Sequence, residues 1–245
     1  IKVIIVQTSN DTTVALAEGV GGSVHRFVQL MNDQCKLLGL KNTGYKNPEG
    51  LTEAGHTTTA RDLSVLATRL MADFPQYTSY YALKKYRYQG TPTTNDGNRN
   101  LLLFRDPTVD GLKTGHTDAA GYCLIATAKR EFAGLGVGTA AGSRRLLAIV
   151  LGTNSENDRA NEAQKLLNWG YTAFEAVKLF DPGQAVVTPK VWKGAENTVK
   201  LGRNEAIVVA LPAGSAAKLK TSISRADPLL APLVKSQQAA ILKIA

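Results

Sequence analysis

The chain has 245 residues, of which 44% are hydrophobic and 20% charged, a composition typical of globular proteins. The net charge is +9, yet the Lys and Arg residues form no run interleaved with aromatic side chains, so the sequence does not predict a nucleic-acid partner. No apolar run reaches the roughly 18 residues of a membrane-spanning helix. Cys35 and Cys123 are the only cysteines, which excludes a disulfide scaffold and a cysteine-based zinc site, and no metal or cofactor is expected.

Three segments carry apolar residues at steps of three and four positions, the spacing that lines one face of a helix. They cover about residues 24–38, 60–73 and 158–176. Ser23 can cap the first helix and Gly39 can end it, while Thr59 can cap the second and Pro75 can end it. We therefore expect three amphipathic helices that pack their apolar faces into a core.

Two apolar runs between the second and third helices predict buried strands, at residues 122–128 and 146–151. The Gly- and Ala-rich stretch from Phe132 to Ser143 would join them as the long loop of a hairpin. Helices around an antiparallel sheet make an α+β layered domain, which we place at residues 1–180.

The pattern changes after Phe180. Asp181, Pro182 and Gly183 form a turn signal, and short alternating segments follow without helical periodicity. Strands are predicted at residues 185–188, 190–192, 198–201, 206–211, 218–223 and 239–243. We therefore expect residues 181–245 to form a second domain, a small all-β sandwich.

The strongest chemical signal is the triplet of Lys113, Thr114 and Gly115, which stands just before the first predicted strand. Lys113 offers a fixed cation, and Thr114 offers a hydroxyl that can bind a carboxylate or relay a proton. Gly115 leaves room for a substrate backbone beside the strand. A sequence of three residues recurs by chance in many chains, and a strand-capping turn on the surface could have the same sequence. The triplet therefore indicates a catalytic site only together with a second sequence element.

The second element lies upstream, where Thr8, a spacer and Asn10 form a hydroxyl–x–Asn sequence. Thr8 can shuttle a proton, and the Asn10 amide can bind a substrate amide. The same segment, with Ser9, also offers good N-caps for a helix, so a structural role is an alternative. The two elements stand in the order in which S-x-N and K-T-G occur in penicillin-recognising enzymes.

With their surroundings, these elements resemble the low-molecular-mass penicillin-binding proteins, specifically the serine-type D-alanyl-D-alanine carboxypeptidase family. The resemblance covers essentially the whole chain and rests on segments in the family's order, at residues 7–18, 31–43, 60–63, 98–102, 109–118 and 165–170. It implies a β-lactamase/transpeptidase-like domain, an antiparallel sheet with helices, followed by a β-sandwich. It also makes Ile1 to Val6 the end of a helix, although these β-branched residues alone would predict a strand.

The resemblance assigns roles by position. Those with catalytic roles are Thr8, Asn10 and Lys113. Those with roles in substrate binding are Thr114, Gly115, His116 and Arg159, of which His116 would give its backbone N–H to an oxyanion hole. The implied reaction removes the terminal D-alanine from a peptidoglycan stem peptide ending in D-Ala-D-Ala through an acyl-enzyme, and β-lactam antibiotics would be covalent inhibitors.

In the family, the serine nucleophile belongs to an S-x-x-K element whose Lys is the base, and no such element precedes Thr8. The one Ser-x-x-Lys here runs from Ser215 to Lys218, after K-T-G and at a turn into a predicted strand, so we interpret it as coincidence. We expect the nucleophile on an upstream segment and the chain by itself to be inactive. The resemblance implies a periplasmic location in the bacterial cell envelope, with peripheral membrane attachment through a segment outside this sequence.

Other functions stay open at this point. A D,D-endopeptidase shares the chemistry. A β-lactamase shares the sequence elements but needs a carboxylate for deacylation, for which Glu49 is the nearest candidate, and the Pro and Gly residues beside Glu49 do not fit the β-lactamase motif. A non-catalytic cell-wall-binding protein is a third alternative, and an upstream S-x-x-K element would distinguish the enzyme from the binder.

Overall fold

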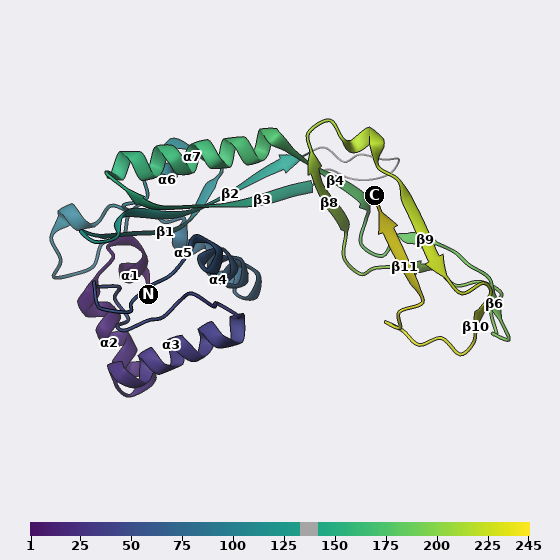
Figure 1. The fold of residues 1–245 in the computed structure, drawn as a ribbon, viewed down its shortest axis with the longest axis horizontal. Coiled ribbons are helices and arrows are strands. Elements are labelled where there is room, and N and C mark those ends of the chain that lie inside the picture. Colours follow the sequence, from purple (N-terminus) through teal and green to yellow (C-terminus); the bar gives the residue numbers. More distant parts are fainter. Residues whose placement is uncertain (133–141) are drawn as a thin grey trace. The chain divides into compact units, whose positions relative to one another are not determined.

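The computed structural model of the chain describes residues 1–132 and 142–245. The chain divides into two compact units, residues 1–129 with 145–168 and residues 130–144 with 169–245. The first unit holds helices around a three-stranded sheet, and the second is built largely of short strands (Figure 1). Most of the loop predicted at residues 132–143 lies outside the described residues.

Three of the helices follow the predicted periodicity, those near residues 24–38, 60–73 and 158–176. The bounds of the helices are α1 Lys2–Val6, α2 Asn10–Gly21, α3 Val24–Leu38, α4 Ala60–Asp73, α5 Thr78–Tyr81, α6 Leu102–Arg105 and α7 Glu156–Ala173. The predicted C-terminal end of the third helix is wrong by three residues. α7 stops at Ala173 because the backbone from Phe174 onward pairs with another strand.

Local capping sets the helix ends where the sequence predicts them. The Ser23 and Thr59 side chains each accept a hydrogen bond from the backbone N–H three residues later, at 3.2 and 3.1 Å. Gly39 ends α3 in the left-handed conformation, with φ +72°. The helical state of residues 1–6 is also confirmed, because α1 buries Val3 and Val6 and this packing overrides the β-branched preference for a strand.

The sheet of the first unit has the order β1–β2–β3, with β1 Val109–Thr117, β2 Gly121–Phe132 and β3 Gly142–Thr153. β1 runs antiparallel to β2. The sequence predicts the K-T-G triplet just before the first strand. In the structure the triplet lies within β1, which is an edge strand of the described sheet. The sequence does not predict β1 because its polar residues and glycines interrupt the apolar pattern.

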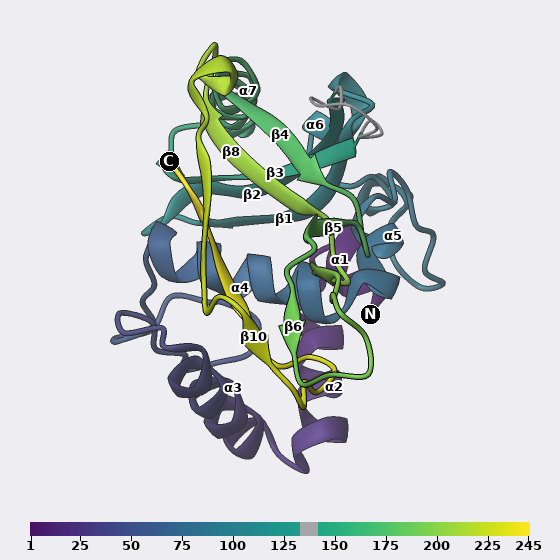
Figure 2. The ribbon, with the colours of Figure 1, turned by 90° about the vertical axis from the view of Figure 1, so that its right-hand side faces the viewer.

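The core of the first unit lies between the sheet and its helices. α7 covers one face of the sheet, and α4 lies on the opposite side (Figures 1 and 2). Leu102 of α6, Leu124 of β2 and Leu167 of α7 each expose at most 1% of their surface. Leu166, which the sequence predicts to point inward, is 45% exposed, because only one of two successive leucines can face the sheet.

The second unit consists of paired short strands. They are β4 Phe174–Phe180, β5 Ala185–Val187, β6 Val191–Trp192, β7 Leu201–Gly202, β8 Ile207–Pro212, β9 Thr221–Arg225, β10 Leu229–Leu230 and β11 Ala240–Ile244. β4 pairs with β8, β5 with β7, β9 with β11, and β6 with β10. β4 belongs to the second compact unit, and a domain boundary at residue 180 stays a prediction. The α+β class with a following all-β part is confirmed.

The Ser-x-x-Lys sequence at residues 215–218, which we interpret as coincidence, forms a turn and a short 3-10 helix, Ala216–Lys218.

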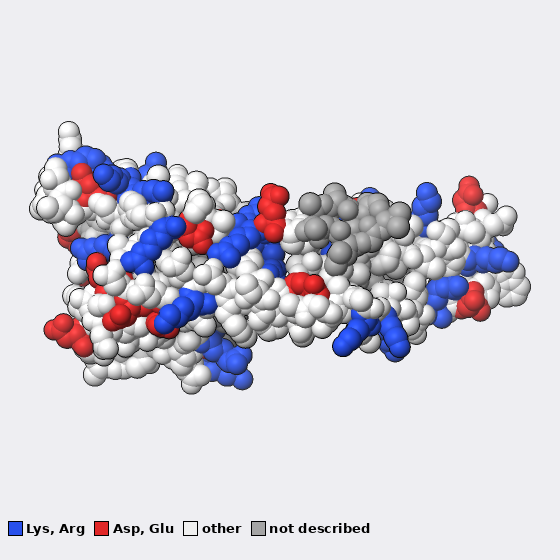
Figure 3. All heavy atoms as spheres, turned by 90° about the horizontal axis from the view of Figure 1, so that it is seen from above, with Lys and Arg blue, Asp and Glu red and all other residues white. Residues whose placement is uncertain are grey.

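In the described part of the chain, no helix combines the length and the apolarity that crossing a bilayer requires. On the face drawn in Figure 3, Lys and Arg side chains are interspersed with Asp and Glu.

Candidate active site

Lys113 lies on the edge strand β1, and its amine is held in an environment that disfavours charge. Its Nζ donates a hydrogen bond to the carbonyl oxygen of Thr114 at 2.8 Å. Burial of the side chain, followed by the positive charges of Arg99 and Arg159, lowers the pKa of Lys113 from 10.5 to about 8. The amine is therefore protonated at neutral pH but can release its proton at mildly alkaline pH.

The three residues of the triplet differ in their access to solvent. Gly115 is exposed, Lys113 is half-buried, and Thr114 is only 8% exposed. A Cβ atom added to Gly115 would meet nothing closer than the Cβ of Cys123, at 4.0 Å. The open side of β1 at Gly115 thus lets another backbone approach the strand.

Arg159 is almost fully buried, with 2% of its surface exposed, and its guanidinium binds three protein acceptors. Nη1 donates to the carbonyl oxygen of Gly115 at 3.3 Å, and Nη2 donates to the carbonyl oxygen of Arg99 and to Glu156 Oε1, both at 3.1 Å. Burial lowers the pKa of Arg159, and the nearby Glu156 partly offsets this. Arg159 therefore ties α7 to β1 and to the segment around Arg99.

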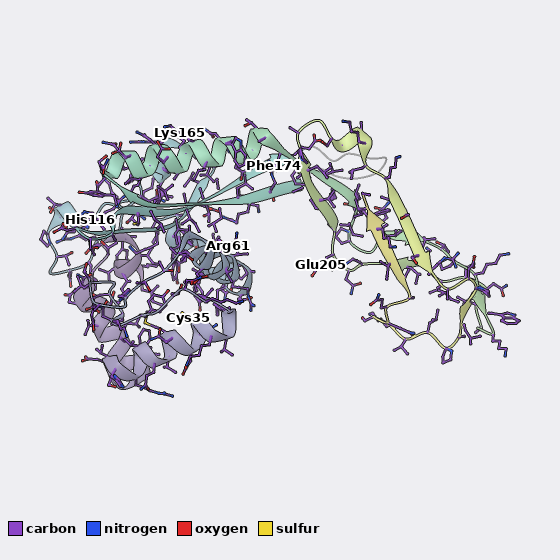
Figure 4. All side chains as sticks on the ribbon, in the orientation of Figure 1. Cys35, Arg61, His116, Lys165, Phe174 and Glu205 are labelled. Atoms are coloured by element: carbon purple, nitrogen blue, oxygen red, sulfur yellow. The ribbon has the colours of Figure 1, made fainter. Side chains whose placement is uncertain are left out.

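An aromatic stack continues this cluster at the end of β1. The rings of His116 and Tyr122 face each other across the β1–β2 pair, with centroids 3.9 Å apart. The Arg159 guanidinium lies 5.4 Å from the centroid of the Tyr122 ring. His116, labelled in Figure 4, is exposed at the end of the sheet. The structure thus brings Lys113, Gly115, His116 and Arg159 together around one end of β1.

Thr8 lies in the turn between α1 and α2 and is conformationally strained. Its φ is +54°, a left-handed value that a β-branched residue rarely adopts. Its hydroxyl donates to the carbonyl oxygen of Gln7 at 2.7 Å. Ser9 is the N-cap of α2, with its side chain accepting from the backbone of Thr12, so the capping interpretation of this segment is confirmed. Strain of this kind concentrates at functional sites, which favours a second role for the turn.

The Thr8 turn is connected to β1 through the intervening loop. The Gln7 side chain is buried and donates to the carbonyl oxygen of Tyr86 at 3.0 Å. Later in the loop that leads to β1, the side-chain amide of Asn100 donates to the carbonyl oxygen of Gly111 at 3.0 Å. α5 packs against both α1 and β1. Among the described residues, neither Thr8 nor Asn10 makes a hydrogen bond to β1, so a shared cleft remains a prediction.

Comparison with known proteins matches two successive segments of the chain. Residues 1–152 match the sequence profile of D-alanyl-D-alanine carboxypeptidase, and residues 174–244 match that of the penicillin-binding protein 5 C-terminal domain. The chain belongs to the D-alanyl-D-alanine carboxypeptidase family.

Curated relatives and a solved structure agree with this assignment. The chain is 39% identical over 238 residues to D-alanyl-D-alanine carboxypeptidase DacC of Escherichia coli, covering 96% of the chain and 56% of the relative. It is 36% identical to DacA of Haemophilus influenzae, covering 96% and 57%. Penicillin binding protein 5 from Haemophilus influenzae has a similar structure, with a TM-score of 0.80, 33% identity, and coverage of 100% of this chain and 68% of that one. The chain thus spans little more than half the length of these curated relatives.

Sequence reasoning about this carboxypeptidase family member missed Arg99 and Tyr122. Arg99 is exposed, yet its charge lowers the pKa of Lys113 and its carbonyl binds Arg159. The sequence signal was its place in the segment 98–102 that resembles the family, between Asn98 and Asn100, two buried asparagines that organise the backbone around it. No group of three or more His, Cys, Asp or Glu residues that could hold a metal occurs among residues 1–132 and 142–245.

Proposed function

We propose that this chain is the substrate-binding part of a serine-type D-alanyl-D-alanine carboxypeptidase that acts on peptidoglycan stem peptides. The observation that carries the proposal is the edge strand β1, where Lys113 and the open Gly115 stand beside the buried cation Arg159. A cationic strand edge without a side chain at Gly115 suits a peptide that ends in a carboxylate. Family membership supports the reaction class.

The proposed reaction has two steps. A serine oxygen attacks the carbonyl carbon of the penultimate D-alanine, the C–N bond breaks, and the terminal D-alanine leaves with a proton on its amine. Water then attacks the acyl-enzyme and releases the shortened peptide. The serine and its Lys base would come from an S-x-x-K element upstream of this sequence. A second cation at Lys113 would lower the pKa of that base, since two nearby positive charges repel.

The remaining assignments follow from this reaction. Thr8 would relay protons, and the Asn10 amide would bind the substrate amide. Thr114 and Gly115 would bind the substrate carboxylate and backbone, and the His116 backbone N–H would stabilise the oxyanion. Arg159 would act on the carboxylate by its charge and by holding Gly115, because three of its five N–H donors already bind protein acceptors.

The same proposal covers domains, ligands and location. Residues 1–180 would be the catalytic domain and residues 181–245 a separate β-sandwich. β-Lactams would acylate the serine. Penicillin-Binding Protein D2 from Listeria monocytogenes, solved in cefotaxime-bound and ampicillin-bound forms, supports this, with 29% identity and a TM-score of 0.57 over 68% of the chain. The protein would act in the periplasmic part of the cell envelope, attached to the inner membrane at its periphery.

A D,D-endopeptidase is the second candidate. The chain is 32% identical over 128 residues to the D-alanyl-D-alanine endopeptidase of Escherichia coli, covering 49% of the chain. The two activities differ in whether the amide cut is terminal or lies in a cross-link. Isolated stem pentapeptide and cross-linked dimer, offered to the complete protein in parallel, distinguish them by the product released.

The decisive experiment treats the complete protein with a fluorescent penicillin, followed by denaturing electrophoresis. We expect a persistent covalent label, and a strong loss of labelling in Lys113→Ala. Lys165→Ala is the matched control, because Lys165 lies on α7 with its side chain 72% exposed and forms an ion pair with Glu162 of the same helix (Figure 4). Absence of label on the wild type at every penicillin concentration would refute the acyl-serine reaction and favour a non-catalytic wall binder.

A further inference from the structure

The edge strand β1 contains an irregularity three residues before Lys113. Val109 pairs with Ala128 of β2, but the next paired residue of β1 is Gly111, opposite Thr127. Asp110 is therefore an extra residue on β1, which makes a β-bulge. Bulges of this kind occur next to active sites, where they change the direction in which the following side chains point.

The side chain of the bulged residue is held from two neighbouring strands. Arg145 of β3 binds both carboxylate oxygens of Asp110, with Nη1 and Nη2 at 2.5 and 2.7 Å. Thr127 of β2, which is fully buried, donates its hydroxyl to Asp110 at 2.8 Å. The bidentate ion pair and the hydrogen bond thus link β1, β2 and β3 through one side chain, and a bidentate Arg–carboxylate pair is stronger than a neutral hydrogen bond.

The backbone next to the bulge is also fixed. The buried Asn100 side chain donates to the carbonyl oxygen of Gly111 at 3.0 Å. A Cβ atom on Gly111 would lie 3.1 Å from Thr127 Oγ1 and 3.2 Å from Tyr81 Cβ, so only glycine fits there without displacement. The residue after the bulge is therefore enclosed by β2, α5 and the segment around Asn100.

The bulge decides which residues of β2 lie opposite the triplet. In the structure, Lys113 pairs with Ile125, and Gly115 pairs with Cys123. If the register set by Val109 and Ala128 continued without the extra residue, Lys113 would stand opposite Leu124, whose side chain is 1% exposed. A slip of one residue turns every following side chain to the other face of a strand. Lys113 would then point into the core.

We propose that Asp110 is a positioning residue, and that the bulge held by Arg145 and Thr127 sets the register in which β1 presents Lys113 and Gly115 to the substrate. This inference rests on the proposed carboxypeptidase function for its catalytic consequence. Its structural part, the pinning of the strand, stands on the contacts of Asp110 alone. Asp110 does not touch the substrate and acts only through the strand.

The test uses the complete protein with Asp110→Ala, Asp110→Asn and, as matched control, Asp73→Asn. Asp73 forms an exposed ion pair with Arg69 on α4, in the same unit. Acylation by a fluorescent penicillin is measured per folded molecule and as a function of pH. Amide hydrogen exchange is measured for residues 112–115.

We expect Asp110→Ala to slow acylation on the order of tenfold to a hundredfold, the loss that follows a misplacement of about 1 Å. Asp110→Asn should fall between Ala and the wild type, since its amide oxygen can still accept from Thr127. The pH dependence should differ from that of the wild type, because a displaced Lys113 changes its burial and its distance from Arg99 and Arg159, the causes that lower its pKa. Exchange at residues 112–115 should accelerate. A merely stabilising ion pair would not move the pH dependence.

Two outcomes would overturn the inference. One is an Asp110→Ala protein that folds and is acylated at the wild-type rate with the wild-type pH dependence. The other is unchanged amide exchange at residues 112–115 in Asp110→Ala relative to Asp73→Asn. If the wild type itself takes no penicillin, the proposed function fails, and the exchange measurement still decides whether Asp110 pins β1.

Discussion

Replacing Lys113 with Met separates the chemical role of this residue from its effect on stability. In the folded chain the pKa of Lys113 falls from 10.5 to about 8, which corresponds to about 3 kcal/mol against the charged amine. At pH 7 the amine is charged in the folded and the unfolded state, so the whole penalty opposes folding. The substitution removes that penalty.

The substitution also removes the hydrogen bond from Nζ to the carbonyl oxygen of Thr114, worth about 1 kcal/mol. Lys113→Met should therefore be more stable than the wild type by about 2 kcal/mol at pH 7, while acylation is lost. Between pH 8 and 10.5 the folded wild type releases its proton before the unfolded state does, so the wild type gains stability and the advantage of the variant disappears.

Urea unfolding at several pH values measures this effect. The helical circular-dichroism signal follows the first unit, where most helices lie, and the fluorescence of Trp169 and Trp192 follows the second unit, which should not change. Lys165→Met, at an exposed position on α7, is the control for removing a lysine. A variant no more stable than the wild type at pH 7, or an advantage that persists unchanged to pH 11, would refute the argument.

Further predictions concern the neighbours of Lys113 and the strained turn. Arg99→Gln should raise the pKa of Lys113 from about 8 toward 10.5, because it removes a nearby positive charge. In a titration of Lys113 against pH, the midpoint of deprotonation should move to higher pH. A titration that is the same as that of the wild type would contradict the coupling. Arg159→Met should lower the free energy of unfolding in urea by about 2–4 kcal/mol, because the carbonyls of Gly115 and Arg99 lose a buried donor. A decrease below about 1 kcal/mol would mean that other donors replace the guanidinium. Thr8→Gly should stabilise the chain by about 1 kcal/mol, because glycine tolerates the positive φ, yet it should lower acylation of the complete protein. A destabilised Thr8→Gly chain would show that the turn is not strained.

The sequence by itself determined the features that depend on neighbours a few positions away. The caps of α3 and α4 are bonds between a side chain and a backbone N–H three residues later, and Gly39 ends α3 through its own conformational freedom. The K-T-G triplet, the hydroxyl–x–Asn element and the other segments that resemble the family are likewise short runs of neighbouring residues. The all-β character after residue 180 followed from the alternation of short segments.

The tertiary structure decided the features whose partners lie far apart in the chain. The lowered pKa of Lys113 requires burial and the charges of Arg99 and Arg159, and the ion pair that holds Asp110 joins positions 35 residues apart. The bond from Arg159 to the Arg99 carbonyl spans 60 residues. No periodicity or capping pattern encodes such contacts, because their geometry exists only once the sheet has its register and α7 lies on it.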